Sequence, residues 1–314
     1  MTPQDDAVQS ASVAGRYRIG IGCMALTGLY GRIVASDARD VLAQATSLGF
    51  RLFDTAPLYA NGQNEALIGD VIGSTEGTTV ATKFGLAETK DGKLMRDSRP
   101  ESIRASVEAS LSRLRRERID ILIQHRPDPA VNDQEVAGAV QDLIDAGKVA
   151  AFGLSGTSID RIKPITDRCT VSVVQNELSV LSDPATWSVP QKIGDMGAFF
   201  MAYAPIARGL LSPNSAKNKR DAEDYRSQIE AFQNPDQSVS QSLRTCLEDI
   251  ASTYGVSVAA LVLAWLRTRG ETVVPIPGPR RAEHLSDFVD AGELEIDASH
   301  ISTIDEAASR QSGG

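Results

Sequence analysis

Residues 119–155 contain IDILIQH (119–125), QEVAGAVQDLIDAG (134–147) and KVAAFGLS (148–155), and this succession of segments indicates the architecture of the chain. The first and third segments are short apolar runs typical of buried parallel strands. The middle segment has its apolar residues at helical spacing, and Gly147 stands where that helix should stop. We therefore expect a strand–helix–strand unit, because parallel strands need a crossover connection such as a helix.

The same alternation continues along the whole chain and gives eight predicted β/α units. Gly49 and Gly270 are further predicted helix ends. Eight units fit a closed (β/α)8 barrel, a TIM barrel, formed by a single domain from residue 16 to 314. A doubly wound open sheet is the alternative, but it would carry GxGxxG after its first strand, and the position three after Gly22 is Ala25. The other predicted strands are RIGIGCM (18–24), RLFD (51–54), TVATKF (79–84), VSVVQNE (171–177), AFFMAYAP (198–205) and TVVPIPG (272–278).

Two segments lie outside the predicted units. Residues 1–15 are polar and are expected to be disordered or loosely attached. Residues 212–240 are charged and rich in turn formers, and they follow the seventh predicted strand. A loop of this length is usually a lid or a disordered insertion, and its place on the catalytic face of a barrel favours a lid over a cofactor or substrate.

Composition excludes several classes of protein. A formal net charge of −9 and a pI near 5.0 argue against a nucleic-acid partner. No apolar stretch approaches the roughly 20 residues that cross a membrane, and the N-terminus does not resemble a signal peptide. Cys23, Cys169 and Cys246 have no CxxC spacing, so neither a disulfide framework nor a metal site is expected. We expect a cytoplasmic protein; its oligomeric state is open, with a monomer favoured.

Three polar residues stand where predicted strands end, and a fourth follows in a loop. Asp54, Lys83 and His125 each close a short apolar run, and Tyr59 lies in the loop after the first of them. The carboxyl ends of barrel strands share one face, so these side chains are expected to meet there. Taken singly, each has an ordinary explanation, such as a turn cap, a rim aromatic, a solvated lysine or a core histidine.

Together the four residues predict a centre that donates a proton during carbonyl reduction. A tyrosine with a pKa of about 10 holds its proton at neutral pH and can donate it when a cation stabilises the phenolate. Lys83 would be that cation, and Asp54 its counter-charge. His125 would donate a hydrogen bond to the carbonyl oxygen and stabilise the charge that forms there.

These residues lie in segments that resemble the aldo-keto reductase family. FDTAPLYANGQNEALIG resembles the family signature that carries a catalytic aspartate and tyrosine, ATKFG the lysine segment, and SRPESIRASVEASLSRLRRERIDILIQHRPD the segment ending in the catalytic histidine. The resemblance runs from about Ile19 to Asp305. Its QHR and SRPE sequences look most like a branch of pyridoxal reductases and broad-specificity bacterial carbonyl reductases.

The resemblance implies a nicotinamide cofactor that lies extended across the barrel mouth. NADPH is favoured over NADH, which stays an alternative, because Arg280 or Arg281 could hold a 2′-phosphate. Ser155 and Gln175 would hold the carboxamide, and Tyr203 would stack on the nicotinamide ring. The full expected cofactor set is Cys23, Met24, Ser155, Gln175, Tyr203, Ala204, Pro205, Ile206, Arg208, Gly209, Ile276, Gly278, Arg280, Arg281, His284 and Asp287. The expected substrate contacts are Met24, Tyr30, Leu58 and Trp187.

The chain also departs from the family pattern. Gly156 stands where the family often has asparagine, which removes one carboxamide contact. His284 and Asp287–Phe288 replace the usual residues of the adenosine segment, and Phe288 is expected at most to pack against the base. The usual N-terminal hairpin is poorly matched, so the barrel floor is expected to close differently.

Three other functions stay open at this point. The same site run in reverse would make an NAD(P)-dependent alcohol or sugar dehydrogenase. A cofactor-binding regulatory subunit is a second alternative, because potassium-channel β-subunits resemble the same family. A metal-dependent hydrolase would need several ligands at strand ends, and the only histidines are His125, His284 and His300.

Overall fold

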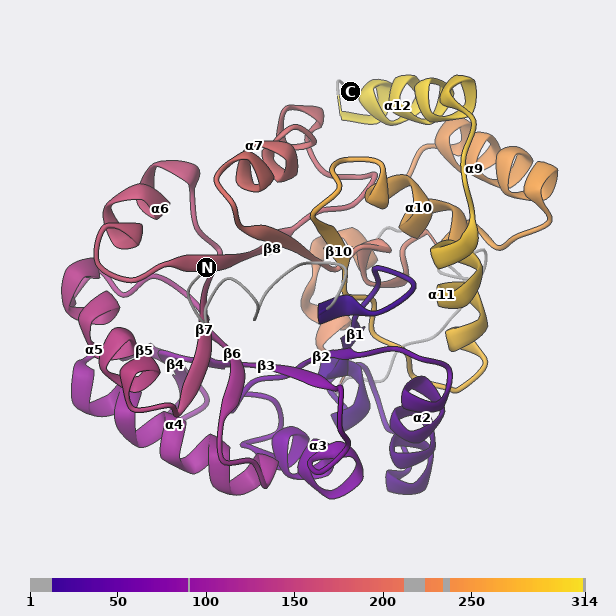
Figure 1. Cartoon of the computed structure of the whole chain (residues 1–314). Coiled ribbons are helices and arrows are strands. Elements are labelled where there is room, and N and C mark those ends of the chain that lie inside the picture. The colour runs from indigo at the N-terminus through magenta and orange to yellow at the C-terminus, as the bar shows by residue number, and fades with distance from the viewer. Residues whose placement is uncertain (1–12, 90, 212–223, 234–237, 313–314) are drawn as a thin grey trace.

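The computed structural model describes residues 13–89, 91–211, 224–233 and 238–312. Its main sheet has eight parallel strands that curl around a common axis, with helices on the outside (Figure 1). The strands are β1 (Ile21–Gly22), β2 (Leu52–Asp54), β3 (Thr79–Phe84), β6 (Ile119–Gln124), β7 (Val149–Ser155), β8 (Val171–Glu177), β9 (Phe199–Tyr203) and β10 (Val273–Pro275). The helices after them are α2 (Ala35–Ser47), α3 (Gln63–Ile72), α4 (Pro100–Leu114), α5 (Asp133–Asp145), α6 (Ile159–Thr166), α7 (Val189–Asp195), α9 (Gln241–Tyr254), α10 (Val258–Arg267) and α11 (His284–Glu293).

Two backbone hydrogen bonds join the first strand region to the last and close the barrel. The amide of Gly20 donates to the carbonyl of Pro275 at 2.9 Å, and that of Gly22 to Pro277 at 2.8 Å. A Cβ at Gly22 would lie 2.7 Å from the Ile276 carbonyl oxygen, so only glycine permits this approach. The predicted (β/α)8 barrel is confirmed.

The interior of the barrel explains why the polar residues converge. Strand side chains alternate between the barrel interior and the helical layer. On β3, Ala81 faces the interior while Val80 packs under the helices, so Lys83 returns to the interior. The inward apolar residues two positions before the predicted site residues are Leu52, Ala81, Ile123, Val173 and Met201, and those site residues are Asp54, Lys83, His125, Gln175 and Tyr203.

The barrel floor is closed by residues that were expected to be loosely attached. Val13 and Ala14 are buried among the inward side chains of the barrel. Arg18 links the N-terminal segment to the end of α10 and the loop after it. Its guanidinium donates to the carbonyls of Glu271 at 2.7 Å and Arg267 at 3.1 Å. The expectation is therefore wrong for Val13 and Ala14, whose small apolar side chains fill the bottom of the barrel. Residues 1–12 lie outside the described chain.

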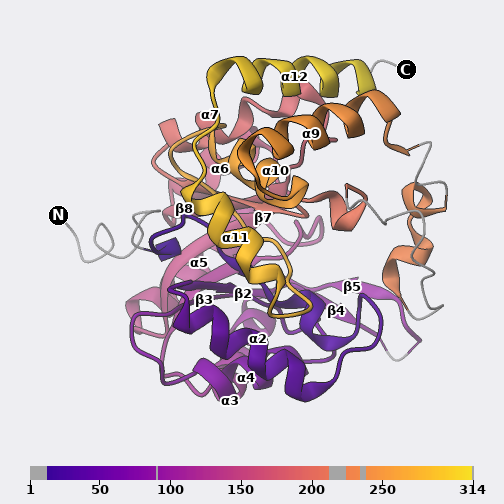
Figure 2. The same ribbon diagram turned by 90° about the vertical axis from the view of Figure 1, so that its right-hand side faces the viewer.

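Two further elements were not predicted. A hairpin of β4 (Leu86–Glu88) and β5 (Leu94–Arg96) follows β3, and Figure 2 shows it at the opposite end of the barrel from the start of the described chain. Helix α12 (Ala298–Ser312) packs on α9, and the indole of Trp265 donates to its Asp305 at 2.7 Å.

Gly49 and Gly147 follow their helices in left-handed conformations, whereas α10 ends at Arg267, before the predicted Gly270.

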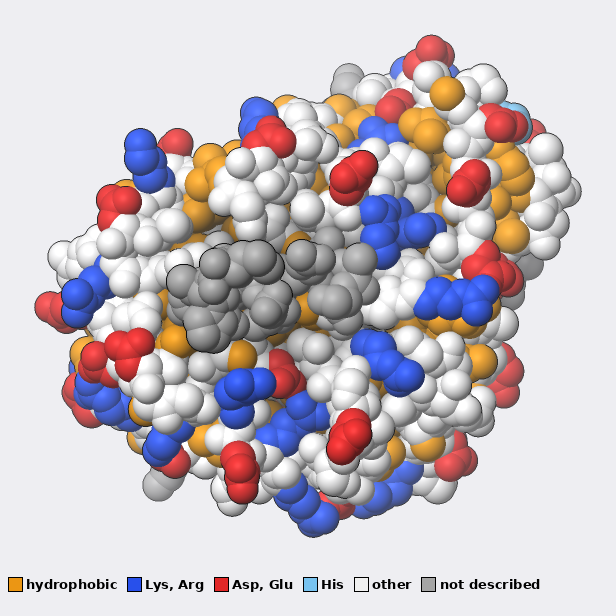
Figure 3. Space-filling model, in the orientation of Figure 1, with side chains coloured by type: hydrophobic (Ala, Val, Ile, Leu, Met, Phe, Trp, Pro, Cys, Tyr) orange, Lys and Arg blue, Asp and Glu red, His pale blue; other side chains and the backbone are white. Residues whose placement is uncertain are grey.

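Acidic and basic side chains are intermixed over the face shown in Figure 3. No single helix of the described residues is long and apolar enough to cross a membrane. Helices α9 and α10 pass that test only as a pair, and they meet at a bend of 90°.

Candidate active site

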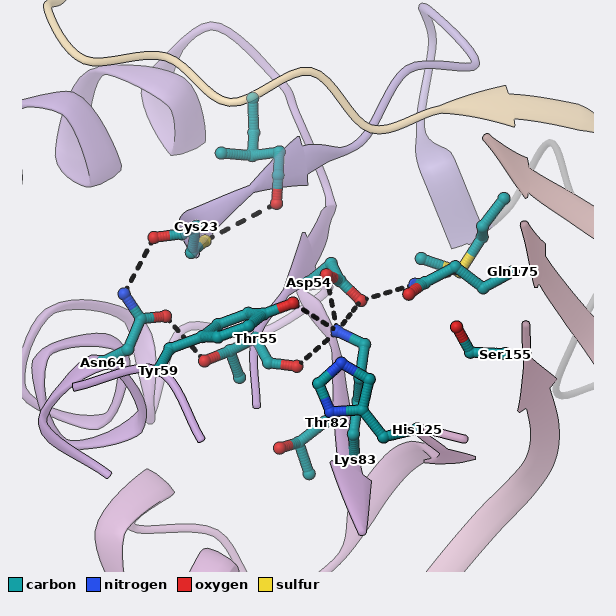
Figure 4. A network of polar contacts seen from close by, with 12 residues as sticks. Cys23, Asp54, Thr55, Tyr59, Asn64, Thr82, Lys83, His125, Ser155 and Gln175 are labelled. Carbon is teal, nitrogen blue, oxygen red and sulfur yellow. Dashed lines mark hydrogen bonds and ion pairs between the residues drawn. The ribbon is translucent and has the colours of Figure 1, made fainter. Parts of the chain in front are cut away.

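The Lys83 ammonium lies at the centre of a buried polar network (Figure 4). Its Nζ is 2.9 Å and 2.8 Å from the two carboxylate oxygens of Asp54, 2.8 Å from the carbonyl oxygen of Thr55 and 3.2 Å from the Tyr59 hydroxyl. Only 1% of Lys83 is exposed. A charge this deeply buried is tolerated because it is paired and fully hydrogen-bonded.

The hydrogen-bond geometry leaves the Tyr59 proton available. An ammonium has three protons and no lone pair, and here the protons are shared among Asp54, Thr55 and Tyr59. The Tyr59 hydroxyl therefore accepts from Lys83 and keeps its own O–H for another acceptor. The arrangement can deliver a proton from Tyr59 and stabilise the oxygen that loses it.

The pKa shifts agree with this protonation state. Burial raises the pKa of Tyr59, and the positive charge of Lys83 opposes that rise. Burial alone would lower the pKa of Lys83, but the charge of Asp54 and the contacts with Tyr59 outweigh it, so this pKa is raised. At neutral pH the phenol is protonated and the amine is charged.

His125 faces the same space from the end of β6. Its ring meets the Tyr59 ring edge to face, with centroids 6.1 Å apart, and its backbone amide donates to Phe84 at 2.9 Å. Burial, helped by the charges of Lys83 and Arg126, holds the pKa of His125 well below its usual value. The imidazole is therefore neutral and has one N–H to donate.

The loop that carries Tyr59 is held by residues that the sequence reasoning missed. Asn64 accepts from the Thr55 hydroxyl at 2.6 Å and donates to the Cys23 carbonyl at 2.8 Å, so it joins the β2 end to the β1 loop. Ala60 and Asn61 have φ of 49° and 52°, a costly left-handed conformation for residues with a Cβ. The only sequence signal was the position of Asn64 inside the NGQNE segment after the tyrosine.

Gln175 and Ser155 line the opposite wall of the network. The Gln175 amide donates to Asp54 at 2.7 Å, so in this structure it supports the carboxylate. Ser155 is 1% exposed, and its Oγ accepts from Arg126 at 3.0 Å. Figure 4 shows Ser155 and Gln175 at neighbouring strand ends beside the network. Among the described residues, no group accepts the Ser155 hydroxyl proton.

The loop after β9 has an unusual backbone. Ala204, Ala207 and Arg208 have φ of 51°, 48° and 54°, and such strain clusters at functional sites. The Arg208 guanidinium binds both carboxylate oxygens of Glu177, at 2.6 Å and 2.7 Å. This two-point ion pair fixes the position of the Arg208 guanidinium at the mouth.

The residues after β10 form the outer end of the expected cofactor site. Arg280 donates to the carbonyls of Gly31 at 3.2 Å and Arg32 at 2.9 Å, and its amide donates to His284 at 3.2 Å. Arg281 is exposed, with Glu283 at 3.9 Å, and Asp287 is half-buried on α11. Phe288 is 2% exposed and packs against Phe50, so its ring presents almost no surface to a cofactor base.

The remaining expected residues divide between the mouth and the core. Ile276 faces the barrel interior, and Cys23 is buried, with burial raising the pKa of its thiol. Trp187 was expected to touch substrate, but its ring packs on Trp265 and Arg269 in the helical layer, so that expectation is wrong. The half-buried positions at or near the mouth are Met24, Tyr30, Leu58, Ala204, Ile206 and Gly209, while Pro205 is buried and Gly278 is exposed.

The described part of the predicted lid lies against two loops of the mouth. In η4 (Tyr225–Gln228), the Tyr225 amide donates to Leu29 at 2.9 Å. Arg226 donates to the carbonyls of Arg208 at 3.2 Å and Tyr30 at 3.4 Å. Residues 212–223 and 234–237 of the predicted lid lie outside the described chain.

The model of the aldo/keto reductase family matches residues 18–309. The chain belongs to this family. Its members are NAD(P)H-dependent oxidoreductases that act on small carbonyl compounds and use NADP(H). No grouping of three or more His, Cys, Asp or Glu side chains suited to a metal is found within the described residues.

Individual relatives agree with the family assignment. A probable aldo-keto reductase 1 of Glycine max is 30% identical over 293 residues, covering 92% of this chain and 85% of that protein. The aldo-keto reductase yakc [NADP(+)] of Schizosaccharomyces pombe is also 30% identical, covering 92% and 87%. A glycerol dehydrogenase from Gluconobacter oxydans superimposes with a TM-score of 0.83 at 29% identity, covering 94% and 92%.

Proposed function

We propose that this aldo-keto reductase reduces an aldehyde or ketone to an alcohol with NADPH, and that Tyr59 donates the proton. The observation that carries the proposal is the hydrogen bond from the Lys83 ammonium to the Tyr59 hydroxyl. It fixes the phenol oxygen as an acceptor, so the phenol proton is free for a substrate. No other group of the network combines a transferable proton with a cation to stabilise its conjugate base.

The residues at the mouth fit a nicotinamide cofactor. Ser155 is buried, and its O–H has no acceptor among the residues that the structure describes, as expected of a binding group for a carboxamide oxygen. Tyr203 at the end of β9 has a half-buried ring that suits stacking, and its phenol pKa is raised by burial. Arg280 and Arg281 would meet the phosphates at the outer end of the site. NADPH, when bound, supplies the hydride that reaches the carbonyl carbon.

The protein supplies everything else that the reduction needs. Tyr59 donates its proton to the carbonyl oxygen, while Lys83 stabilises the resulting phenolate and Asp54 keeps Lys83 charged. The neutral His125 donates a hydrogen bond to the same oxygen as negative charge develops on it. Because the donors are held by buried contacts, little rearrangement is needed during the reaction.

A second function, oxidation of an alcohol or a polyol, is favoured by one observation. The Gluconobacter oxydans protein with the TM-score of 0.83 is a glycerol dehydrogenase. In that direction the Tyr59 phenolate would accept the hydroxyl proton, and Lys83 would stabilise that phenolate before it accepts the proton.

Coenzyme turnover at 340 nm tests both functions. NADPH and NADH oxidation would be followed with a panel of aldehydes, pyridoxal included, and NADP+ reduction with glycerol and other polyols. Aldehyde-dependent oxidation of NADPH, with the alcohol identified as product, is the expected result. Turnover confined to polyol oxidation would favour the second function, and binding of NADPH without turnover in either direction would contradict both.

A further inference from the structure

Arg126, which follows His125 at the end of β6, places a guanidinium group inside the proposed nicotinamide site. Its Nη1 donates to the carbonyl oxygen of His125 at 2.7 Å and to Ser155 Oγ at 3.0 Å. Its central carbon lies 5.8 Å from the centre of the Tyr203 ring. The guanidinium therefore touches or faces groups that we propose to hold the nicotinamide ring.

The local backbone makes room for this side chain. A Cβ at Gly156 would lie 3.0 Å from Arg126 Cδ and 3.2 Å from its Nη1. Gly156 also has φ of 63°, which a residue with a side chain adopts only at a cost. Arg126 thus occupies the space that a side chain at 156 would fill.

Within the described part of the chain, no carboxylate pairs with the Arg126 guanidinium. Among the described residues, the ion pairs closer than 4.0 Å do not include Arg126. Its partners are a carbonyl oxygen, a hydroxyl and a π-face, which are all neutral groups. A ligand in this site therefore meets a full positive charge.

We propose that Arg126 determines which redox form of the coenzyme the site prefers, and that it selects the reduced form. The inference rests on the proposed function, because it needs the nicotinamide ring beside Ser155 and Tyr203. The reduced ring is neutral and the oxidised ring is positively charged, so a fixed guanidinium repels only the oxidised ring. The carboxamide is common to both forms, and its contact with Ser155 does not discriminate between them.

The proposal bears on the direction of the reaction. A site that holds NADPH more tightly than NADP+ takes up the reductant and releases the oxidised product readily. Arg126 would therefore favour carbonyl reduction over alcohol oxidation in a site whose proton-transfer residues work in both directions.

Coenzyme binding to the full-length protein tests the proposal without relying on turnover. Dissociation constants for NADPH and NADP+ would be measured separately, by fluorescence and calorimetry, for wild type, Arg126→Met and Arg126→Lys. We expect Arg126→Met to reduce the ratio of the NADP+ constant to the NADPH constant by roughly tenfold, the size expected for two partly solvent-screened charges. Arg126→Lys keeps the charge and should preserve most of the ratio. Arg104→Met is the matched control, because Arg104 is exposed and pairs with Asp142 on the outer helices.

The outcomes separate this proposal from the function on which it rests. An unchanged ratio in Arg126→Met, with both coenzymes bound, would overturn the proposal and leave the proposed function intact. Unchanged coenzyme binding together with a raised KM only for carbonyl substrates that carry a carboxylate would also overturn it and assign Arg126 to the substrate. Failure of wild type to bind either coenzyme would overturn both.

Discussion

The two sides of the barrel mouth are built in different ways. The β2, β3 and β6 side consists of buried side chains that hydrogen-bond one another, with Lys83 at their centre. On the β9 and β10 side, arginines bind backbone carbonyls or the partly exposed Glu177, in loops with left-handed residues. The first side holds the proton donor in place through buried contacts, whereas the second presents arginine side chains to a large ligand.

Removing the central cation should break the first side most severely. Lys83→Met leaves the Asp54 carboxylate buried without its partner, so we expect the free energy of unfolding to fall by about 3–5 kcal/mol and turnover to be lost. Chemical denaturation and coenzyme oxidation would measure the two effects. The double variant Asp54→Asn/Lys83→Met removes both charges and should recover part of the stability but no turnover. Equal stability of the two variants would contradict the ion-pair account.

Removing the two hydrogen bonds of Asn64 should give the next largest loss of stability. Asn64→Ala leaves the buried Thr55 hydroxyl and Cys23 carbonyl without a partner, which costs about 1–3 kcal/mol of stability. Because Asn64 acts through the position of Tyr59, we expect kcat to fall while the NADPH dissociation constant changes little. Loss of coenzyme affinity with unchanged kcat would show that Asn64 acts on the other side of the mouth.

The neutral imidazole of His125 should make stability depend on pH. Because its folded pKa is depressed, the unfolded chain binds this proton more readily as pH falls below about 6.5. Stability should therefore drop on acidification, with a slope from this group of up to about 1.4 kcal/mol per pH unit. Denaturation of wild type and His125→Asn between pH 7 and pH 5 would measure it. An equal slope in both proteins would contradict a neutral, buried His125.

Changes on the β9 and β10 side should be milder and confined to the coenzyme. Arg281 is exposed and lies 3.9 Å from a carboxylate oxygen of the equally exposed Glu283, so Arg281→Gln should leave stability unchanged. We expect its NADPH dissociation constant to rise about fivefold, the effect of losing about 1 kcal/mol of a solvent-exposed charge contact, with no change for NADH. Glu283→Gln is the neighbouring control. Equal weakening for both coenzymes would exclude a 2′-phosphate role.

The same contrast separates what the sequence could predict from what it could not. Asp54 and Lys83 were predictable because side chains alternate along a strand, so each faces the barrel interior like the apolar residue two positions before it, Leu52 or Ala81. Trp187 lies in a connection after β8, where side chains do not alternate as they do along a strand, so the sequence could not predict its direction. Its ring packs into the helical layer.

Other features depended on contacts between distant segments. Helix α12 is stabilised by docking on α9 and by the Trp265–Asp305 hydrogen bond, which its own sequence does not indicate. The position of Arg126 depends on the missing side chain at Gly156. The two residues follow different strands, so only the fold brings them together. The sequence showed that Gly156 lacks a side chain, but the structure was needed to find what fills the space.

The role of Tyr59 as proton donor is best tested by comparing Tyr59→Phe with Tyr254→Phe. Both variants lose one phenol hydroxyl, but that of Tyr254 bonds His300 at 2.8 Å on the outer helices. We predict that Tyr59→Phe lowers kcat for aldehyde reduction by roughly a hundredfold or more and still binds NADPH, whereas Tyr254→Phe keeps wild-type turnover. A Tyr59→Phe variant as active as wild type would show that another group donates the proton.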